Sequence, residues 1–248
     1  GWENFDMLFS DSRFLRVIRN TLCMSFINLV LGFATAIFLA ILINEIRQMK
    51  FKRVVQSVTY LPHFLSWIIV TGFVFNFLAT GDGLINNILL KLGFIQESIP
   101  WLGTPKYFWW IVGFSHVWKE MGWNSIIYLA AIAGISPELY EAAYIDGATK
   151  FQTFKRIILP LMSPILTFVA VTQFMAPWFD FILPSFLISS DEKKTLAVGL
   201  YELINGLANN NFTMFAAGSV LVAAPVALLY LFLQKYLVEG LSAGANKG

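Results

Sequence analysis

The sequence predicts an all-α fold, a polytopic membrane bundle of helices joined by short connections. Of the 248 residues, 57% are hydrophobic and only 13% are charged, and the mean hydropathy is +0.67. Soluble proteins carry about 25% charged residues, so a soluble globule of this size would lack the solvated side chains that cover a surface. Long runs without a charged residue supply the spans that such a bundle requires. The composition therefore argues against a soluble enzyme.

Net charge and the metal-binding residue types argue against two further classes. The formal net charge is +2, which is too small to indicate a nucleic-acid partner. The chain contains two histidines and a single cysteine, Cys23. These are too few for a typical structural zinc site, and one thiol cannot form an internal disulfide. We expect no metal site in this chain.

The first span is predicted from Thr21 to Asn44, a run that contains no charged residue. A bilayer core about 30 Å thick requires roughly 20 helical residues, so this run is long enough to cross it. Ahead of the span, the arginines within residues 11–19 alternate with apolar residues at helical spacing, which favours an interfacial helix. We assign residues 1–19 to an extracytoplasmic interfacial segment.

The next three spans are expected to be less regular. Residues 54–81 carry no charge, but Pro62 indicates a kink near the start, so the apolar body of the second span is placed at residues 64–79. The third span is predicted over residues 107–136 and the fourth over residues 157–179.

The fifth span lies within residues 203–234, and its helix is expected to begin only after the three asparagines at 209–211. Residues 20–236 together form the predicted transmembrane domain. We assign residues 237–248 to a cytoplasmic tail, of which residues 240–248 are small and polar.

Two of the connections, residues 45–53 and 136–160, are polar and basic, and we place them at the cytoplasmic face. Residues 80–106 and 184–212 then lie on the opposite face, the former with a short amphipathic surface helix from Leu84 to Leu92. Basic residues are slightly more numerous on the first face, which favours this orientation by the positive-inside rule.

The connection over residues 136–160 contains two helix signals. Ser136 and Pro137 are typical of a helix N-cap and first position. Gly147 permits a turn, and a second helix is expected from Thr149 to Pro160. Two helices at an angle would project from the lipid and present a surface suited to a groove in another protein.

This connection resembles the EAA loop of permease subunits in binding-protein-dependent ABC importers. The spacing from the Glu-Ala-Ala group to the glycine, and from the glycine to the Ile-x-Leu-Pro group, agrees at every position. The matching positions are Glu141, Ala142, Ala143, Gly147, Ile157, Leu159 and Pro160.

The remainder of the chain is similar to the carbohydrate branch of that family. Asn20-Thr21 begins one span and Tyr60-Leu61-Pro62 begins the next. The segment after Met175 looks most like maltodextrin permeases, and residues 44–135 look closer to permeases for complex oligosaccharides. The resemblance implies a type I permease core with five spans present and the first of the usual six absent. Because the chain also starts at Gly1 without methionine, we read it as a fragment.

The resemblance implies a set of partners: two ATP-binding ABC subunits, a second homologous permease, an extracytoplasmic solute-binding protein and a saccharide. It places the chain in the bacterial cytoplasmic (inner) membrane and implies that the first helix of the EAA loop docks on an ATPase subunit, driving alternating access. Phosphate-binding and nucleophile motifs of enzymes are missing from the sequence. We therefore expect no catalytic residues and no cofactor here, with ATP and Mg²⁺ bound by the partner.

Charged residues inside the third span indicate a functional pathway. Lys119 and Glu120 lie in its middle, where charges are expensive unless they face a partner or a water-filled cavity. Consecutive helical residues point about 100° apart, so we expect one to line the pathway and the other to pair with a neighbouring subunit. Sugars bind through hydroxyl hydrogen bonds and ring stacking, and the predicted pathway residues are Trp118, Lys119, Glu120, Trp123, Asn124, Tyr128, Gln173 and Trp178.

Each of these interpretations has an alternative. The loop could be an ordinary surface connection, and Trp118 and Trp123 could face lipid or pack. Asp180 could be merely interfacial, and His63 is expected to be a helix-end hydrogen bonder. Functional alternatives are an importer of a non-sugar solute, a channel, or an intramembrane enzyme with Glu120 or Asp180 as its acid or base.

Overall fold

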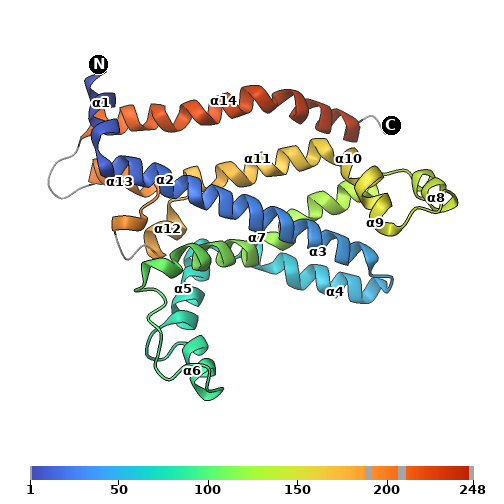
Figure 1. Cartoon of the computed structure of the whole chain (residues 1–248), viewed down its shortest axis with the longest axis horizontal. Coiled ribbons are helices and arrows are strands. Elements are labelled where there is room, and N and C mark those ends of the chain that lie inside the picture. The colour runs from blue at the N-terminus through green and yellow to red at the C-terminus, as the bar shows by residue number, and fades with distance from the viewer. Residues whose placement is uncertain (1, 188–190, 206–210, 246–248) are drawn as a thin grey trace.

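The computed structural model describes residues 2–187, 191–205 and 211–245. Within these ranges every regular element is a helix, in agreement with the predicted all-α fold. Figure 1 shows long helices lying side by side in an elongated bundle, from which α5 and α6 project as an arm. A pair of helices, α8 and α9, extends beyond one end of the bundle.

The first span belongs to one continuous helical segment, Ser12–Glu45. It comprises α2 (Ser12–Ile27), a π-helical turn (Asn28–Gly32) and α3 (Phe33–Glu45), and α1 (Glu3–Ser10) precedes it. The separate interfacial helix expected over residues 11–19 is therefore wrong in its boundary. Apolar side chains of this stretch, including Phe14, are buried in the bundle rather than lying on its surface. The helix that carries them continues into the first span without a break.

The second region is broken far more sharply than the expected kink. Helix α4 (Met49–Tyr60) and the 3-10 turn Leu61–Phe64 meet α5 (Trp67–Leu78) at 100°. Pro62 lies in that turn, and the Ser66 hydroxyl accepts the Ile69 amide as the N-cap of α5, so a new helix axis begins there. Residues 49–53, which were expected to belong to a connection, form the beginning of α4.

A glycine brings α4 against the central helix α7 (Phe108–Ala133). A Cβ atom added at Gly122 would collide with the carbonyl oxygen of Thr59. The absence of a side chain at this position therefore permits a close backbone approach. This contact fixes the break after α4 next to the middle of α7.

The projecting arm is organised around one buried amide. Helix α6 (Leu84–Lys91) follows α5 and agrees with the predicted short helix, whose location at a membrane surface remains a prediction. The Asn86 side chain is fully buried, donates to the carbonyls of Ala79 and Ile99, and accepts the Trp101 indole N–H at 2.9 Å. These bonds hold the chain between α6 and α7 in one conformation.

The loop helices follow α7 in the predicted order. They are α8 (Pro137–Ile145), then α9 (Lys150–Thr153), a π-helical turn (Phe154–Ile158) and α10 (Leu159–Leu161). Helix α11 (Ser163–Phe179) is bent by 74° from the preceding segment. Helix α11, the long helix of the predicted fourth span, therefore begins at Ser163 rather than at residue 157, because Pro164 cannot continue the helix hydrogen bonds through this point.

The last elements are α12 (Ile182–Leu187), a 3-10 turn (Asp191–Lys193), α13 (Leu196–Asn205) and α14 (Phe212–Ala245). The start of α14 at Phe212 confirms the expected start after the asparagines, of which 209 and 210 lie outside the described residues. The helix continues to Ala245, through most of the segment assigned to a tail.

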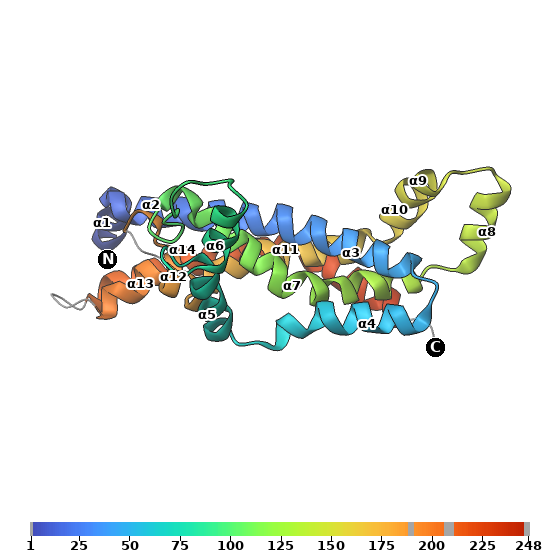
Figure 2. The same cartoon turned by 90° about the horizontal axis from the view of Figure 1, so that it is seen from below.

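Figures 1 and 2 place the α3–α4 turn and the α8–α9 loop at one end of the bundle, and α1 and α13 at the other. The basic connections thus share one end, as predicted. Two described helical segments are long and apolar enough to span a membrane, and up to five spans result if each of three bent pairs is counted as one. The five spans remain a prediction.

Candidate functional site

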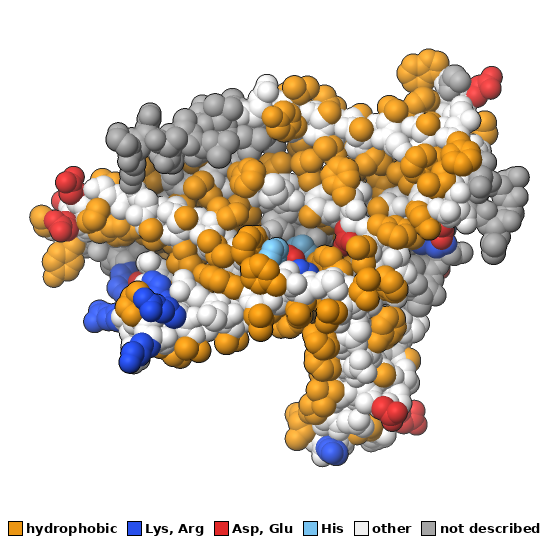
Figure 3. Space-filling model, turned by 180° about the vertical axis from the view of Figure 1, so that it is seen from behind, with side chains coloured by type: hydrophobic (Ala, Val, Ile, Leu, Met, Phe, Trp, Pro, Cys, Tyr) orange, Lys and Arg blue, Asp and Glu red, His pale blue; other side chains and the backbone are white. Residues whose placement is uncertain are grey.

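A polar cleft of about 420 Å³ opens in the middle of the bundle. Figure 3 shows it as a small group of pale blue, red and blue side chains surrounded by hydrophobic surface. Segments from four helices contribute to it: the π-helical turn of the first span, α5, α7 and α11. The polar side chains that line it are Asn28, His116, Glu120, Asn124, Thr172, Gln173 and Asp180, with Trp67 among the aromatic ones.

Three ionisable side chains are linked beside this cleft. The Lys119 ammonium donates to the backbone carbonyl of His63 at 2.6 Å and lies 3.1 Å from a Glu120 carboxylate oxygen. The other carboxylate oxygen lies 2.7 Å from Nδ1 of His63. Only 6% of the Lys119 side chain is exposed, so its charge is compensated inside the protein rather than by water.

Glu120 lines the cleft and Lys119 does not, whereas both side chains meet each other within this chain; pairing of either with a neighbouring subunit stays a prediction. Their backbone positions differ by a helical turn angle, but the long lysine side chain bends back toward the α4–α5 break. The break exposes the His63 carbonyl, which accepts the ammonium. His63 is therefore the helix-end hydrogen bonder that we expected, and it also connects both charges.

Aromatic rings enclose the linked charges. The His63 ring stacks on Trp123 with centroids 4.3 Å apart, and the Lys119 ammonium lies 5.2 Å from the centroid of the Trp67 ring. Trp67 also stacks on His116 at 6.2 Å. Cation–π contact and ring stacking favour this desolvated arrangement. Trp123 thus belongs to the site through His63.

Amide side chains also line the cleft. Nε2 of His116 and Oε1 of Gln173 lie 3.1 Å apart, and both side chains are buried. Asn28 begins the π-helical turn, where the wider backbone spiral is typical of functional positions. Oδ1 of Asn28 and Nδ2 of Asn124 are buried and have no hydrogen-bond partner within the described structure. Because both residues also line the cleft, a polar ligand or water there could complete their hydrogen bonds.

Asp180 ends α11 at the rim of the same cleft. Its carboxylate accepts the backbone amides of Ile182 and Leu183 at the start of α12. These bonds give Asp180 a structural role as a helix cap in addition to its place at the cleft.

Three predicted pathway residues lie away from the cleft. Trp118 lines an apolar groove between α5 and α7, where it meets Phe73 edge to face. Tyr128 is fully buried and packs edge to face on Phe33. Trp178 is buried among apolar side chains of α1, α2 and α14. Their aromatic rings serve packing, which was the alternative interpretation for Trp118.

The loop at the end of the bundle has a well-defined turn. Gly147 has a φ of +71°, which favours glycine. The amides of Gly147 and Ala148 donate to the carbonyls of Tyr144 and Ala143, the two bonds of a Schellman motif. On the other side of the turn, Thr149 caps α9 in a reciprocal capping box with Gln152.

Helix α8 exposes both large apolar side chains and a charged one. Tyr144 and Ile145 are 83% and 82% exposed, and Glu141 and Ala142 are exposed beside them, whereas Ala143 is buried. Burial raises the pKa of Tyr140, so this phenol is neutral near pH 7. Of the other EAA-loop positions, Ile157 is half-buried in the π-helical turn, and Leu159 and Pro160 are exposed in α10. Figure 2 shows α8 well beyond the last turns of α3 and α4.

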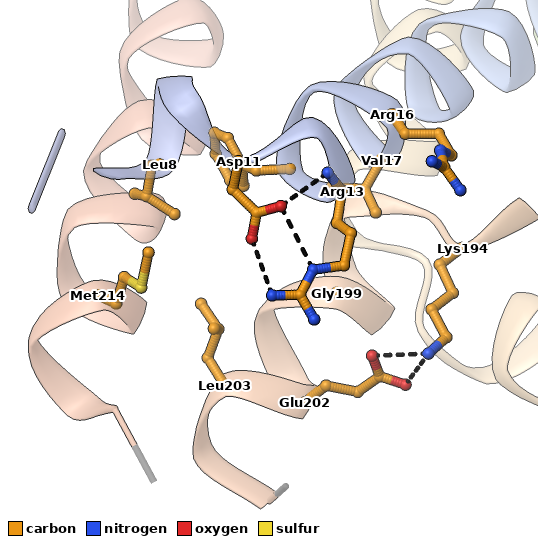
Figure 4. A pocket seen from close by; sticks show the side chains of 11 residues that line it. Leu8, Asp11, Arg13, Arg16, Val17, Lys194, Gly199, Glu202, Leu203 and Met214 are labelled. Carbon is orange, nitrogen blue, oxygen red and sulfur yellow. Dashed lines mark hydrogen bonds and ion pairs between the residues drawn. The ribbon is translucent and has the colours of Figure 1, made fainter. Parts of the chain in front are cut away.

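A second cavity, of about 330 Å³, lies at the opposite end of the bundle between α1, α2, α13 and α14. Figure 4 shows two ion pairs among its charged side chains, Arg13 with Asp11 at 3.1 Å and Lys194 with Glu202 at 2.7 Å, and Arg16 as a further cation in the lining. Because most of its charged side chains are engaged in ion pairs, we take the central cleft rather than this cavity as the candidate site.

The pathway prediction did not include Trp67, His116 and Asn28, and it gave His63 a helix-end role only. His116 precedes Glu120 by four residues, so helical spacing inside an apolar span could have indicated it. Asn28 is polar within an apolar run, but nothing in the local sequence shows that it and Trp67 face the same cleft as Glu120. Among the described residues, no group of three or more His, Cys, Asp and Glu side chains is arranged to hold a metal ion.

Comparison with known proteins identifies the family. Residues 29–242 match the model of the family described as binding-protein-dependent transport system inner membrane component. The polygalacturonan/rhamnogalacturonan transport system permease protein YteP of Bacillus subtilis is 37% identical over 70% of this chain. That match covers 53% of YteP, so the chain spans about half the length of this relative. The maltodextrin transport system permease protein MalD of Streptococcus pneumoniae is 32% identical over 74% of this chain and 69% of its own length.

Solved structures agree with this assignment. A bacterial ABC transporter that imports the acidic polysaccharide alginate matches with a TM-score of 0.83 and 33% identity over 96% of this chain and 84% of that chain. A second structure of a bacterial alginate transporter, in complex with an alginate pentasaccharide-bound periplasmic protein, matches with a TM-score of 0.81 and 33% identity, covering 94% of this chain and 81% of that chain. The chain therefore belongs to the family of inner-membrane components of binding-protein-dependent transport systems.

Proposed function

We propose that this chain is a permease subunit of an ATP-driven importer that moves a saccharide across the cytoplasmic membrane by alternating access. The observation that carries the proposal is the central cleft, which combines amides, carboxyls and aromatic rings inside an apolar bundle. Hydroxyl hydrogen bonds and ring stacking are the contacts that a sugar requires. The named relatives include permeases for maltodextrin and for polygalacturonan.

The exposed α8 would couple this cleft to ATP hydrolysis. Its tip offers Tyr144 and Ile145 as apolar contacts and Glu141 as a charged one, a combination suited to a groove on a cytoplasmic ATPase subunit. We propose two such subunits, with ATP and Mg²⁺ bound there. The shared end of the two basic connections supports the assignment of this end to the cytoplasm.

The opposite end would receive the saccharide from an extracytoplasmic solute-binding protein, as the alginate transporter solved with a periplasmic protein suggests. A second homologous permease would complete the pathway, because the cleft of one chain is open on one face of the bundle. ATP-driven closure of the ATPase pair would move α8 and open the cleft outward, and hydrolysis would return it.

The test is uptake of labelled oligosaccharides into proteoliposomes that contain the full-length permease, its partner permease, ATPase and binding protein. We expect uptake to require both internal ATP and the binding protein. Flux without nucleotide would indicate a channel, and turnover of a substrate by the permease alone would indicate an enzyme. ATP-dependent uptake of only non-sugar solutes would overturn the saccharide assignment and retain the importer.

A further inference from the structure

The saccharides named for related permeases differ in charge, and the walls of the cleft distinguish the two kinds. Two carboxyl groups, Glu120 and Asp180, line it. None of its lining residues is a lysine or an arginine, as far as the described chain shows. The neighbouring Lys119 does not line the cleft, since its ammonium is occupied by Glu120 and the His63 carbonyl. The lining is therefore neutral to negative.

We propose that the cleft of this chain selects uncharged oligosaccharides over uronic acid oligosaccharides. The inference rests on the proposed function, because it concerns the saccharide that such an importer would carry. A uronate carboxylate entering this cleft would lose its water and meet the carboxyl of Asp180 and that of Glu120, whose counter-ion Lys119 is already engaged, so no lysine or arginine of the described lining compensates it. A neutral sugar has no such penalty.

The unpaired amide atoms support the same choice. Oδ1 of Asn28 requires a donor, and Nδ2 of Asn124 requires an acceptor. A sugar hydroxyl can donate to the first and accept from the second, whereas an ionised carboxylate can only accept. A hydroxymethyl group at C6 can satisfy either atom, whereas a C6 carboxylate can satisfy only the Asn124 amide.

The hydrophobic part of the cleft also suits a neutral sugar. Trp67 lines the cleft and is held in place by stacking on His116. Trp67 is only partly buried, so its remaining surface can contact the apolar C–H groups of a pyranose, and this contact does not depend on charge. The Lys119 ammonium lies over the same ring, which further engages this cation with the protein.

The experiment measures binding to the purified assembly of permeases and ATPases without the solute-binding protein, so that selection by that protein is removed. The probes are matched oligosaccharides of equal length and linkage that carry either hydroxymethyl or carboxylate groups at C6. We expect the neutral form to bind at least about tenfold more tightly. Equal or tighter binding of the uronate would overturn the inference while ATP-dependent uptake of either sugar would keep the proposed function.

A variant that removes the carboxylate partner of Lys119 provides a second test. Glu120→Gln removes the carboxylate that compensates Lys119, so uronate binding should strengthen several-fold relative to the neutral form. The double variant Lys119→Met/Glu120→Gln should lose that gain. Glu45→Gln is the matched control, because it frees Lys150 at the exposed end of the bundle and should leave the preference unchanged. An unchanged preference in Glu120→Gln, in an assembly that still forms, would contradict the role given to this pair.

Discussion

One lysine–carboxylate pair lies beside the central cleft, and another joins the projecting loop to the end of α3. The N···O distances of the two pairs are almost equal. Lys119 lies 3.1 Å from Glu120, and Lys150, at the start of α9, lies 3.0 Å from Glu45 at the end of α3. The side chains of the first pair are 6% and 16% exposed, and those of the second are 87% and 59% exposed. Distance is thus a poor guide to what the pairs contribute, and burial decides it.

This difference in burial indicates a different role for each pair. The buried pair holds the α4–α5 break against α7, so it supports the shape of the cleft. The exposed pair joins the start of α9 to the end of α3, and α8 extends beyond this contact, where a partner can reach it. Four variants test this division, in order of decreasing effect.

Lys119→Met should have the largest effect. Removing Lys119 leaves the buried Glu120 carboxylate with His63 as its remaining side-chain partner and costs up to about 3–5 kcal/mol. A lower thermal unfolding midpoint of the assembled complex would measure this loss. The double variant Lys119→Met/Glu120→Gln should recover a large part of it. If Lys119→Met behaves like Lys150→Met, the contrast between the two pairs is wrong.

Gly122→Ala tests the backbone contact next to the buried pair. The added Cβ would meet the Thr59 carbonyl, so α4 must move away from α7, at a cost of about 1–3 kcal/mol. The unfolding midpoint of the complex again gives the measurement. Gly72→Ala in α5 is the matched control, because its Cβ would meet nothing within 4 Å. Equal stability of the two variants would refute the close approach.

Gly147→Val tests the turn after α8. A β-branched residue at a φ of +71° is disfavoured by about 1–2 kcal/mol, which would disturb the Schellman turn. We expect ATP hydrolysis to continue while ATP-driven uptake falls. Gly147→Asn, which tolerates this conformation, should retain most of the uptake. Undiminished uptake in Gly147→Val would remove the turn from the coupling mechanism.

Glu45→Gln should have the smallest effect. Exposed ion pairs contribute about 0–1 kcal/mol, so the midpoint should hardly change. Raising the salt concentration should also reduce the difference from the unchanged protein. A loss as large as that of Lys119→Met would show that this pair, too, is protected from water in the assembly.

The sequence predicted the loop better than the cleft for a physical reason. The loop is encoded locally: Ser136-Pro137 starts one helix, Gly147 turns the chain and Thr149 starts the next. The cleft joins Asn28, Trp67, Glu120 and Gln173, which lie on four segments far apart in the chain. Residue type alone could not show which aromatic side chains face it, so Tyr128 and Trp178 were placed in the pathway although they pack in the core.

Helix boundaries show the same limit. Charge-free runs located the long helices, but not the 100° break at Pro62, since a proline in a span can produce either a kink or a new helix axis. Packing of α4 on α7 through Gly122 settles that choice, and this contact has no signature in the local sequence.

The central claim is that the cleft binds the saccharide and the α8 loop couples it to ATP hydrolysis. The most direct test measures saccharide affinity and ATP-driven uptake together, in the full assembly, for Asn124→Ala and Gly147→Val. We predict that Asn124→Ala weakens binding and raises the apparent transport constant with coupling intact, because its amide faces the cleft. Gly147→Val should keep the affinity and lose uptake. If both variants lose affinity and uptake in the same proportion, the two regions do not have separate roles and the account is wrong.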